Sequence, residues 1–394
     1  MTHAKYGGND MKQVQQLEIL KHLIAIPSVN GREAAVADYL TKLFTPYQDQ
    51  IQIERVTYAP GRDNLVITAG QGTKTLGLAG HMDVVAPGDL AQWTTDPFEA
   101  TVKAGRLYGR GACDMKSGLA AIVVALLEML EHQTLPGRIR LLATVGEETG
   151  EYGAAQLTKA GYADDLAGLV IAEPSADLRE VGYTAKGVID YILTAKGQSA
   201  HASQPQLGIN ALDHVLEFAT QAKARLAKLD QVDPVLGPLT HVISVINGGE
   251  QINSVPAQAT LQGNIRTIPA HPNQQVYDIL AGLVAELNQR PGYDLRLTYS
   301  FPEEPMPGVA DAPLLKLIDQ VHQDVFGTSV TPVGQAGASD GSEFLHAKGD
   351  FTIALIGPGG DTSHASNEFV DLAVYYQAIE FYQRLAAAFF TPDN

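Results

Sequence analysis

Hydrophobic and polar residues alternate along the chain in two ways, which predict helices and short buried strands in turn. Apolar residues at helical spacing indicate amphipathic helices, and short apolar runs indicate strands buried on both faces. Helices are expected at residues 14–23, 32–44, 117–132, 314–327 and 372–390, and strands at 64–70, 75–81, 138–146, 168–174 and 351–359. Strands that alternate with helices in this way predict an α/β fold around a mostly parallel sheet.

The middle of the chain has a different order of elements. It is predicted to run strand, helix, strand, strand, helix, strand, at residues 189–195, 210–229, 241–247, 257–267, 273–288 and 293–299. This β-α-β-β-α-β order is that of the ferredoxin-like split motif. We therefore expect two domains: a discontinuous larger domain of residues 1–183 and 302–394, and a ferredoxin-like domain inserted at 184–301.

Composition restricts the classes of partner. The 394 residues include 44 acidic and 27 basic ones, which gives a formal net charge of −17. Nucleic acids and anionic membranes attract basic surfaces, so neither is expected as a partner. No apolar run approaches the roughly 18 residues that span a bilayer, and residues 1–10 lack the pattern of a signal peptide. A cytoplasmic location is expected. One cysteine, Cys113, excludes an internal disulfide and a cysteine-rich metal site.

Carboxylates and imidazoles gather where predicted strands end or a helix begins. There are five such positions. Two of them hold a pair of residues, His81 with Asp83 and Glu147 with Glu148, and three hold a single residue, namely Asp114, Glu173 and His364. Ligands of open α/β sheets bind beyond the carboxyl ends of the strands, so these positions can converge although the sequence separates them. Taken singly, each residue has an ordinary explanation as a hydrogen-bonded histidine, a helix N-cap or a solvated charge. The complete set favours a metal site.

This set of side chains suits a pair of divalent cations. Carboxylate and imidazole ligands without thiolate are typical of zinc, cobalt or manganese sites. Two cations roughly 3.5–4 Å apart need one carboxylate that bridges them and terminal ligands on each. One remaining carboxylate could act as the base for a bridging water, and another could orient a ligating histidine.

Five segments together resemble the M20 metallopeptidase family, particularly its ArgE/DapE-type deacylase branch: GHMDVV, GRGACDMKSG, GEETG, AEP and SHASNE. They occur in the family's order along nearly the whole chain. The resemblance implies that the discontinuous domain is a di-metal catalytic domain. His81, Asp114 and Glu173 would hold one ion. The same Asp114, as a bridge, would hold the other ion together with Glu148 and His364.

The resemblance also assigns residues around the metals. Glu147 would be the general base and then the acid, and Asp83 would orient His81. Family members commonly carry a cis peptide after the bridging aspartate, so Asp114–Met115 is expected to be cis. In the inserted domain, the segment GQSAHASQPQLGINAL implies that His201 lies near the scissile carbonyl.

Three further residues would bind the substrate. The segment QINSVPAQATLQGNIRTIP implies Asn253 and Arg266, and AGASDGSEF implies Ser339. Strict desuccinylases tend to carry arginines where this chain has Lys186 and Ser342, which weakens the case for a dicarboxylic acyl group. Glutamate at position 173, where many dipeptidase relatives carry aspartate, favours a deacylase or carboxypeptidase.

The expected function is hydrolysis of the amide bond of N-acyl amino acids or similar small amides by a metal-bound hydroxide. Zinc is the expected metal, with cobalt or manganese as alternatives. The partner is a small-molecule N-acyl amino acid or a short peptide, and the chain is expected to form a homodimer through the inserted domain.

Three other interpretations stay open. A carboxypeptidase or dipeptidase would use the same metals. A cysteine hydrolase built on Cys113 lacks a motif that supplies its own base. A binding protein whose site has decayed would have lost its metal chemistry, yet every position of the metal set is intact here.

Overall fold

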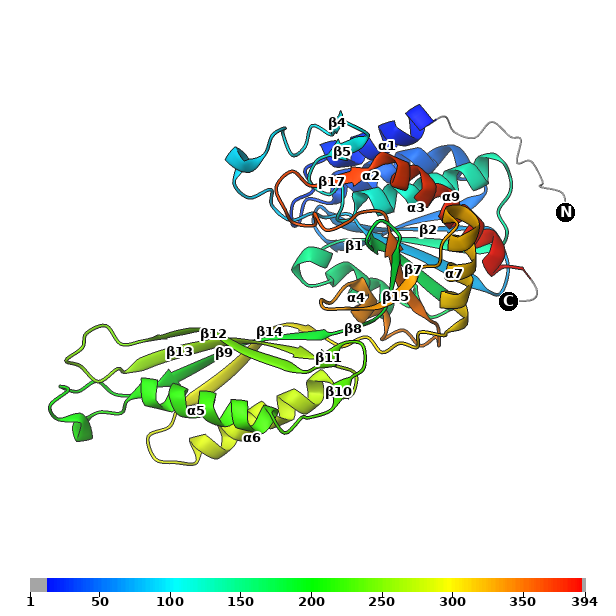
Figure 1. Cartoon of the computed structure of the whole chain (residues 1–394). Coiled ribbons are helices and arrows are strands. Elements are labelled where there is room, and N and C mark those ends of the chain that lie inside the picture. The colour runs from blue at the N-terminus through cyan, green and yellow to red at the C-terminus, as the bar shows by residue number, and fades with distance from the viewer. Residues whose placement is uncertain (1–12, 392–394) are drawn as a thin grey trace. The chain divides into compact units, whose positions relative to one another are not determined.

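The computed structural model describes residues 13–391, which divide into two compact units (Figure 1). The larger unit comprises the described residues up to Tyr183 together with Gly308–Val333 and the described residues from Ser339 onward. The smaller unit comprises Thr184–Pro307 and Gly334–Ala338, so it extends past the expected boundary at residue 301. Residues 1–10, on which the expectation about a signal peptide rests, lie outside the described part.

The larger unit is built on an eight-stranded sheet with the strand order β1-β2-β6-β3-β7-β16-β8-β15. The four adjacent strands β6, β3, β7 and β16 are parallel, whereas β1 and β2 at one edge are antiparallel, as is β8 to β16. This confirms the predicted α/β fold with a largely parallel sheet. The strands are β1 (Ile51–Ala59), β2 (Arg62–Ala69), β3 (Thr75–His81), β6 (Arg138–Thr144), β7 (Leu166–Pro174), β8 (Glu180–Ala185), β15 (Thr331–Gln335) and β16 (Ile353–Gly357).

Helix α3 lies at the centre of the larger unit's core. Its residues Lys116–Leu130 are all buried, because α3 packs against α1, α9 and the sheet at once (Figure 1). A helix that is apolar on every side is stable only in such a position. The helices of this unit are α1 (Gln13–Ala25), α2 (Ala34–Phe44), α3 (Lys116–Glu131), α4 (Tyr152–Lys159), α7 (Pro313–Phe326), α8 (Asp340–Phe344) and α9 (Leu372–Phe389), with 3-10 turns η1 (Thr45–Tyr47), η2 (Leu90–Gln92) and η3 (Glu147–Thr149).

A small three-stranded sheet joins two distant parts of the larger unit. Its strands β17 (Phe369–Asp371), β5 (Arg106–Tyr108) and β4 (Thr101–Lys103) lie in this order, and both pairings are antiparallel. The pairing of β5 with β17 brings the segment before Asp114 next to the segment after His364.

The smaller unit contains a four-stranded antiparallel sheet in the order β12-β13-β9-β14. If these four strands are numbered along the chain and read from β14 to β12, the order is 4-1-3-2, which is that of a ferredoxin-like fold. Residues such as Leu193, Phe218, Leu261 and Leu280 form a core between the sheet and its two helices. The elements are β9 (Gly187–Lys196), η4 (Pro205–Leu207), α5 (Ala211–Leu226), β10 (Val232–Asp233), β11 (Gly237–Pro238), β12 (Thr240–Gly248), β13 (Gln258–Thr267), α6 (Asn273–Asn288) and β14 (Leu295–Glu303).

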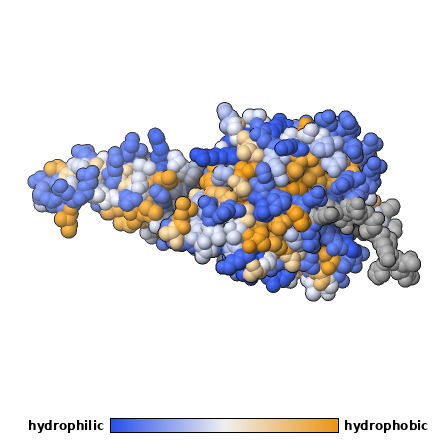
Figure 2. All heavy atoms as spheres, turned by 90° about the horizontal axis from the view of Figure 1, so that it is seen from above, coloured by the Kyte–Doolittle hydropathy of each residue, from blue (hydrophilic) through white to orange (hydrophobic). Residues whose placement is uncertain are grey.

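Figure 2 shows hydrophilic residues over much of the viewed face, interrupted by smaller hydrophobic areas. Within residues 13–391, no helix combines the length and the apolar character that crossing a membrane requires.

Candidate metal centre

The parallel strands bring the predicted ligands to one edge of the sheet. His81 is the last residue of β3, Glu147 and Glu148 follow β6 in η3, and Glu173 lies near the end of β7. Asp114 precedes α3, and His364 lies in the loop after β16. Because β6, β3, β7 and β16 are parallel neighbours, their carboxyl ends meet at this edge.

Asp114 lies between the two histidines. Its Oδ1 is 3.1 Å from Nε2 of His81, and its Oδ2 is 3.5 Å from Nε2 of His364. One oxygen therefore faces each imidazole, which is the arrangement that a carboxylate bridging two cations requires. The Asp114–Met115 peptide bond is cis, as the resemblance predicted.

The structure forms two ligand groups that share Asp114. Within each group, the ligand atoms lie within 4.8 Å of one another. One group is His81, Asp114 and Glu173, and the other is Asp114, Glu148 and His364. These are the two sets that the resemblance implies. A third group overlaps them and consists of His81, Glu147 and Glu148.

The imidazole of His81 is buried and faces several carboxylates. Its Nε2 is 3.9 Å from Glu147 and from Glu173, in addition to Asp114 at 3.1 Å. Burial by itself lowers the pKa of His81, but the hydrogen bond with Asp114 and the charges of the two glutamates outweigh it and hold this pKa well above its ordinary value. The cluster therefore has an excess of negative charge that favours a cation.

Glu173 and Glu147 are enclosed carboxylates. Burial is the largest cause that raises the pKa of each well above its ordinary value, and the neighbouring carboxylates raise it further. Among the described residues, Oε1 of Glu173 has no hydrogen-bond partner although it is buried. A buried oxygen without a partner is costly unless a bound ion or water satisfies it, so this donor set fits a metal ion.

Asp83 orients the site in two ways. Its backbone carbonyl accepts the hydrogen of Nδ1 of His81 at 2.9 Å, which turns Nε2 of that ring toward Asp114 and the other predicted ligands. Its carboxylate lies 3.8 Å from the same nitrogen. That carboxylate instead accepts hydrogen bonds from the backbone N–H groups of Gly146, Glu147 and Glu148, at 2.9, 3.2 and 3.2 Å. Asp83 thus fixes the glutamate turn as well as the histidine.

Arg110, Glu368 and Asp340 are charged residues near the site that were not among those predicted from sequence. Arg110 and Glu368 form a fully buried pair, and Asp340 accepts a hydrogen bond from Thr144 at 2.5 Å. The charge of Asp340 contributes to the raised pKa of Glu147. All three stand in segments that carry the family resemblance, and a charged residue there without a ligand role is the signal that could have identified them.

The remaining predicted residues lie in other places. His201, Asn253 and Arg266 belong to the smaller unit, where the N–H of Ala202 donates to the carbonyl of Asn253, so the loops of His201 and Asn253 are adjacent. The exposed His201 contacts Ser203 through Nδ1 at 2.8 Å. Ser339 belongs to the larger unit, where its hydroxyl caps α8 by accepting from Gly341. Contact of these four residues with a substrate stays a prediction.

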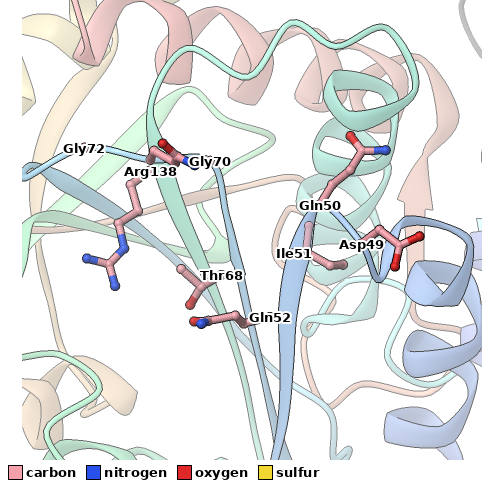
Figure 3. A pocket seen from close by; sticks show the side chains of 9 residues that line it. Asp49, Gln50, Ile51, Gln52, Thr68, Gly70, Gly72 and Arg138 are labelled. Carbon is pink, nitrogen blue, oxygen red and sulfur yellow. The ribbon is translucent and has the colours of Figure 1, made fainter.

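A polar pocket of about 470 Å³ lies at a different part of the sheet (Figure 3). It is lined by the start of β1, the end of β2 and Arg138, which begins β6. Arg138 pairs with Thr75, the first residue of β3. The pocket therefore lies at the amino ends of the parallel strands, opposite to His81, and contains none of the predicted ligands.

Sequence comparison connects the chain to named enzymes. It is 33% identical to a Staphylococcus epidermidis protein named probable succinyl-diaminopimelate desuccinylase, over 96% of this chain and 98% of that protein. It is 30% identical to an acetylornithine deacetylase of Proteus mirabilis, over 91% of this chain and 92% of that protein.

Solved structures have the same fold. A tripeptidase from Staphylococcus aureus is 24% identical and matches with a TM-score of 0.77, over 96% of this chain and 100% of that one. A Bacillus subtilis protein described as a dinuclear metal-binding peptidase of the M20 family is 16% identical, with a TM-score of 0.67 over 95% of this chain and 97% of that one. The model of peptidase family M20/M25/M40 matches residues 77–388, and the chain therefore belongs to that family of metal-dependent hydrolases.

Proposed function

We propose that this chain is a di-metal amidohydrolase that releases amino acids from N-acyl amino acids or similar small amides. The observation that carries the proposal is Asp114, which presents one carboxylate oxygen to each of two histidine-containing ligand groups. The similarity to proteins named desuccinylase and deacetylase supports an acyl amino acid as the substrate class.

Zinc is the metal we propose for both positions, with cobalt and manganese as alternatives, because the donors are imidazole and carboxylate without thiolate. His81, Asp114 and Glu173 would hold one ion, and Asp114, Glu148 and His364 the other. When bound, such ions polarise the amide carbonyl and make a water molecule more acidic.

Glu147 is proposed as the residue that moves protons. Glu148 is engaged with His364 at 2.9 Å, whereas Glu147 belongs to neither of the two groups that share Asp114. The side chain of Glu147 is 13% exposed, so its carboxylate can meet a water molecule. It would accept the proton of the attacking water and deliver it to the leaving amine, and Asp83 holds its turn through the backbone amides.

The smaller unit is proposed to contribute to substrate binding and to dimerisation. Arg266 and Asn253 would bind the carboxylate end of the substrate together with Ser339 of the larger unit, since a guanidinium pairs well with a carboxylate. His201 would stabilise the oxyanion in the site of the partner subunit.

Homodimerisation is supported by the exposed edge of the smaller unit's sheet. Strand β12 lies at this edge, and its Val242 and Ile246 are 55% and 44% exposed, while Leu216 on α5 is 49% exposed. An exposed apolar edge strand is a template for pairing, and a second copy related by a two-fold axis would cover it.

A substrate panel tests the proposed activity. N-acetyl and N-succinyl amino acids are compared with dipeptides, each with zinc, cobalt or manganese and after treatment with a chelator. Chelator-sensitive release of amino acids from the acyl substrates is the expected result. Faster cleavage of dipeptides would favour the carboxypeptidase or dipeptidase alternative, and hydrolysis that survives complete metal removal would contradict the proposal.

A further inference from the structure

A buried carboxylate organises the turn that carries Asp114. The side chain of Glu368 is fully buried. Its Oε1 accepts hydrogen bonds from the backbone N–H groups of Gly111, Cys113 and Asp114, at 3.1, 2.8 and 2.9 Å. Three backbone donors within four residues therefore converge on one oxygen, and this convergence fixes the course of the backbone up to the bridging aspartate.

Arg110 extends this arrangement to the histidine loop. Its Nη1 donates to Oε2 of Glu368 at 2.5 Å. Its Nη2 donates to the backbone carbonyl of His364 at 3.2 Å and to that of Ala86 at 3.4 Å. Arg110 is only 1% exposed, so the guanidinium also neutralises a carboxylate that would otherwise be buried without a countercharge.

The backbone of the histidine loop needs such support. His364 has a φ of 63° and Asn367 has a φ of 59°, both in the left-handed region that side chains other than glycine rarely adopt. Histidine and asparagine adopt that region more often than most residues, but it still costs energy, which contacts around the loop can offset. The carbonyl of His364 is held by Arg110, and the carbonyl of Glu368 accepts the N–H of Gly109 at 3.0 Å.

We propose that Arg110 and Glu368 are positioning residues that fix Asp114 and His364 for metal binding. The inference rests on the proposed function, because both residues are taken to keep ligands of the metal site of Asp114, Glu148 and His364 in position. Neither side chain contacts a predicted metal-binding atom. Their effect is transmitted through the backbone of two segments that are 250 residues apart and are also paired through β5 and β17.

Glu368→Gln tests the carboxylate. The amide keeps the shape but presents an N–H₂ group either to Arg110 or to the three backbone donors. We expect zinc binding at the site of Asp114, Glu148 and His364 to weaken about 10- to 100-fold, the usual range for a residue that supports a metal ligand. The measurement is competition with a chromophoric zinc chelator, at a temperature where circular dichroism shows the variant to be folded.

A second readout does not depend on metal. In the metal-free chain, amide hydrogen exchange of the segment 111–114 should accelerate in Glu368→Gln, because its backbone donors then meet either an N–H₂ group or a neutral amide oxygen, which is a weaker acceptor than a carboxylate. The matched control is Glu128→Gln. Glu128 is also buried and accepts from Gln16 and Gln383 at 2.8 and 2.6 Å, but it lies roughly 18 Å along α3 from the start of that helix. This control should lose thermal stability without a change in zinc affinity.

Arg110→Lys is the conservative variant. Lysine keeps the charge opposite Glu368 but cannot also reach the His364 carbonyl with a second planar donor. It should therefore weaken the zinc ion held with His364 while leaving the ion held with His81 nearly unchanged. Arg140→Lys is its control, because Arg140 is a buried arginine that donates to Tyr162 and Asp165 instead.

The outcomes separate this inference from the proposed function. Wild-type chain that binds no second zinc ion overturns both. Wild-type chain that binds two ions, with Glu368→Gln binding them equally tightly, overturns the positioning role alone. Equal loss of zinc affinity in Glu128→Gln at matched thermal stability would show that Glu368 acts only through general stability, which also overturns it.

Discussion

At the scale of single residues, neighbouring carboxylates have different proposed roles because they contact different groups. Glu148 is in contact with His364, whereas the adjacent Glu147 faces His81 at 3.9 Å and remains partly exposed. Asp83 is also a carboxylate, but its oxygens accept hydrogen bonds from the backbone amides of the glutamate turn. The type of residue is thus less informative about its role than the set of groups that its oxygens meet.

Glu147→Gln should lower turnover by at least about 10²–10⁴, which is the usual contribution of a general base. Both metal ions should stay bound, because Glu147 belongs to neither group that shares Asp114. Turnover of a saturating acyl substrate and zinc content are measured on the same preparation. Glu148→Gln is the control and should lose metal. Loss of metal from Glu147→Gln would mean that the two glutamates exchange roles.

Cys113 should be inert toward alkylating reagents in the folded chain. It is fully buried, and burial raises the pKa of its thiol to about 11, so that about one thiol in a thousand is ionised at pH 8. Incubation with iodoacetamide at pH 8 should leave both the mass of the chain and its hydrolytic activity unchanged. The denatured chain should be alkylated fully under the same conditions. Rapid alkylation of the folded chain with loss of activity would instead support a cysteine hydrolase.

At the scale of elements, the sequence predicts much of what surrounds the site. The strands β3, β6, β7 and β16 and the helix α3 follow from mainly apolar runs, and the parallel order of the strands explains why the ligands converge. Strand β1 was not predicted because none of its residues is buried and no apolar run marks it. The pairing of Arg110 with Glu368 could not be predicted, since no local pattern shows which two buried charges meet across 258 residues.

Metal binding should stabilise the larger unit, because the ligands come from the ends of several strands and the start of α3. At a free zinc concentration about 100 times the dissociation constant, the stabilisation is about 2.7 kcal/mol. In a domain of 150–250 residues, each kcal/mol of stabilisation raises the melting temperature by about 2–4 °C. Thermal unfolding is followed with zinc and with a chelator. His364→Ala should gain less from zinc, and an equal gain would remove His364 from the ligand set.

At the scale of the whole molecule, the two units have separate cores, and the predicted site residues are distributed between them. The metal-binding groups belong to the larger unit, whereas His201, Asn253 and Arg266 belong to the smaller one. The element order predicted the ferredoxin-like arrangement of the smaller unit. The sequence does not reveal whether its residues serve their own chain or a partner, because that depends on assembly.

Subunit exchange tests this assembly. His201→Ala and Glu147→Gln chains should each be nearly inactive. If His201 acts across a dimer interface, a mixed dimer has one site that lacks both residues and one that lacks neither. An equal mixture should then recover about a quarter of wild-type activity. His81→Ala mixed with Glu147→Gln is the control and should recover none, because both residues serve the same site of their own chain. Verified exchange without recovery would mean that His201 does not act in trans.

The zinc stoichiometry of the wild-type chain and of Asp114→Asn tests the central claim most directly. The purified chain is stripped with a chelator, titrated with zinc and assayed on an N-acyl amino acid at each step. We predict two zinc ions per wild-type chain, with activity that disappears on stripping and returns on titration. Asp114→Asn should bind at most one ion tightly and remain inactive, because the amide cannot supply a charged oxygen to each of two cations. Two ions bound with wild-type affinity by Asp114→Asn would contradict a site bridged by Asp114.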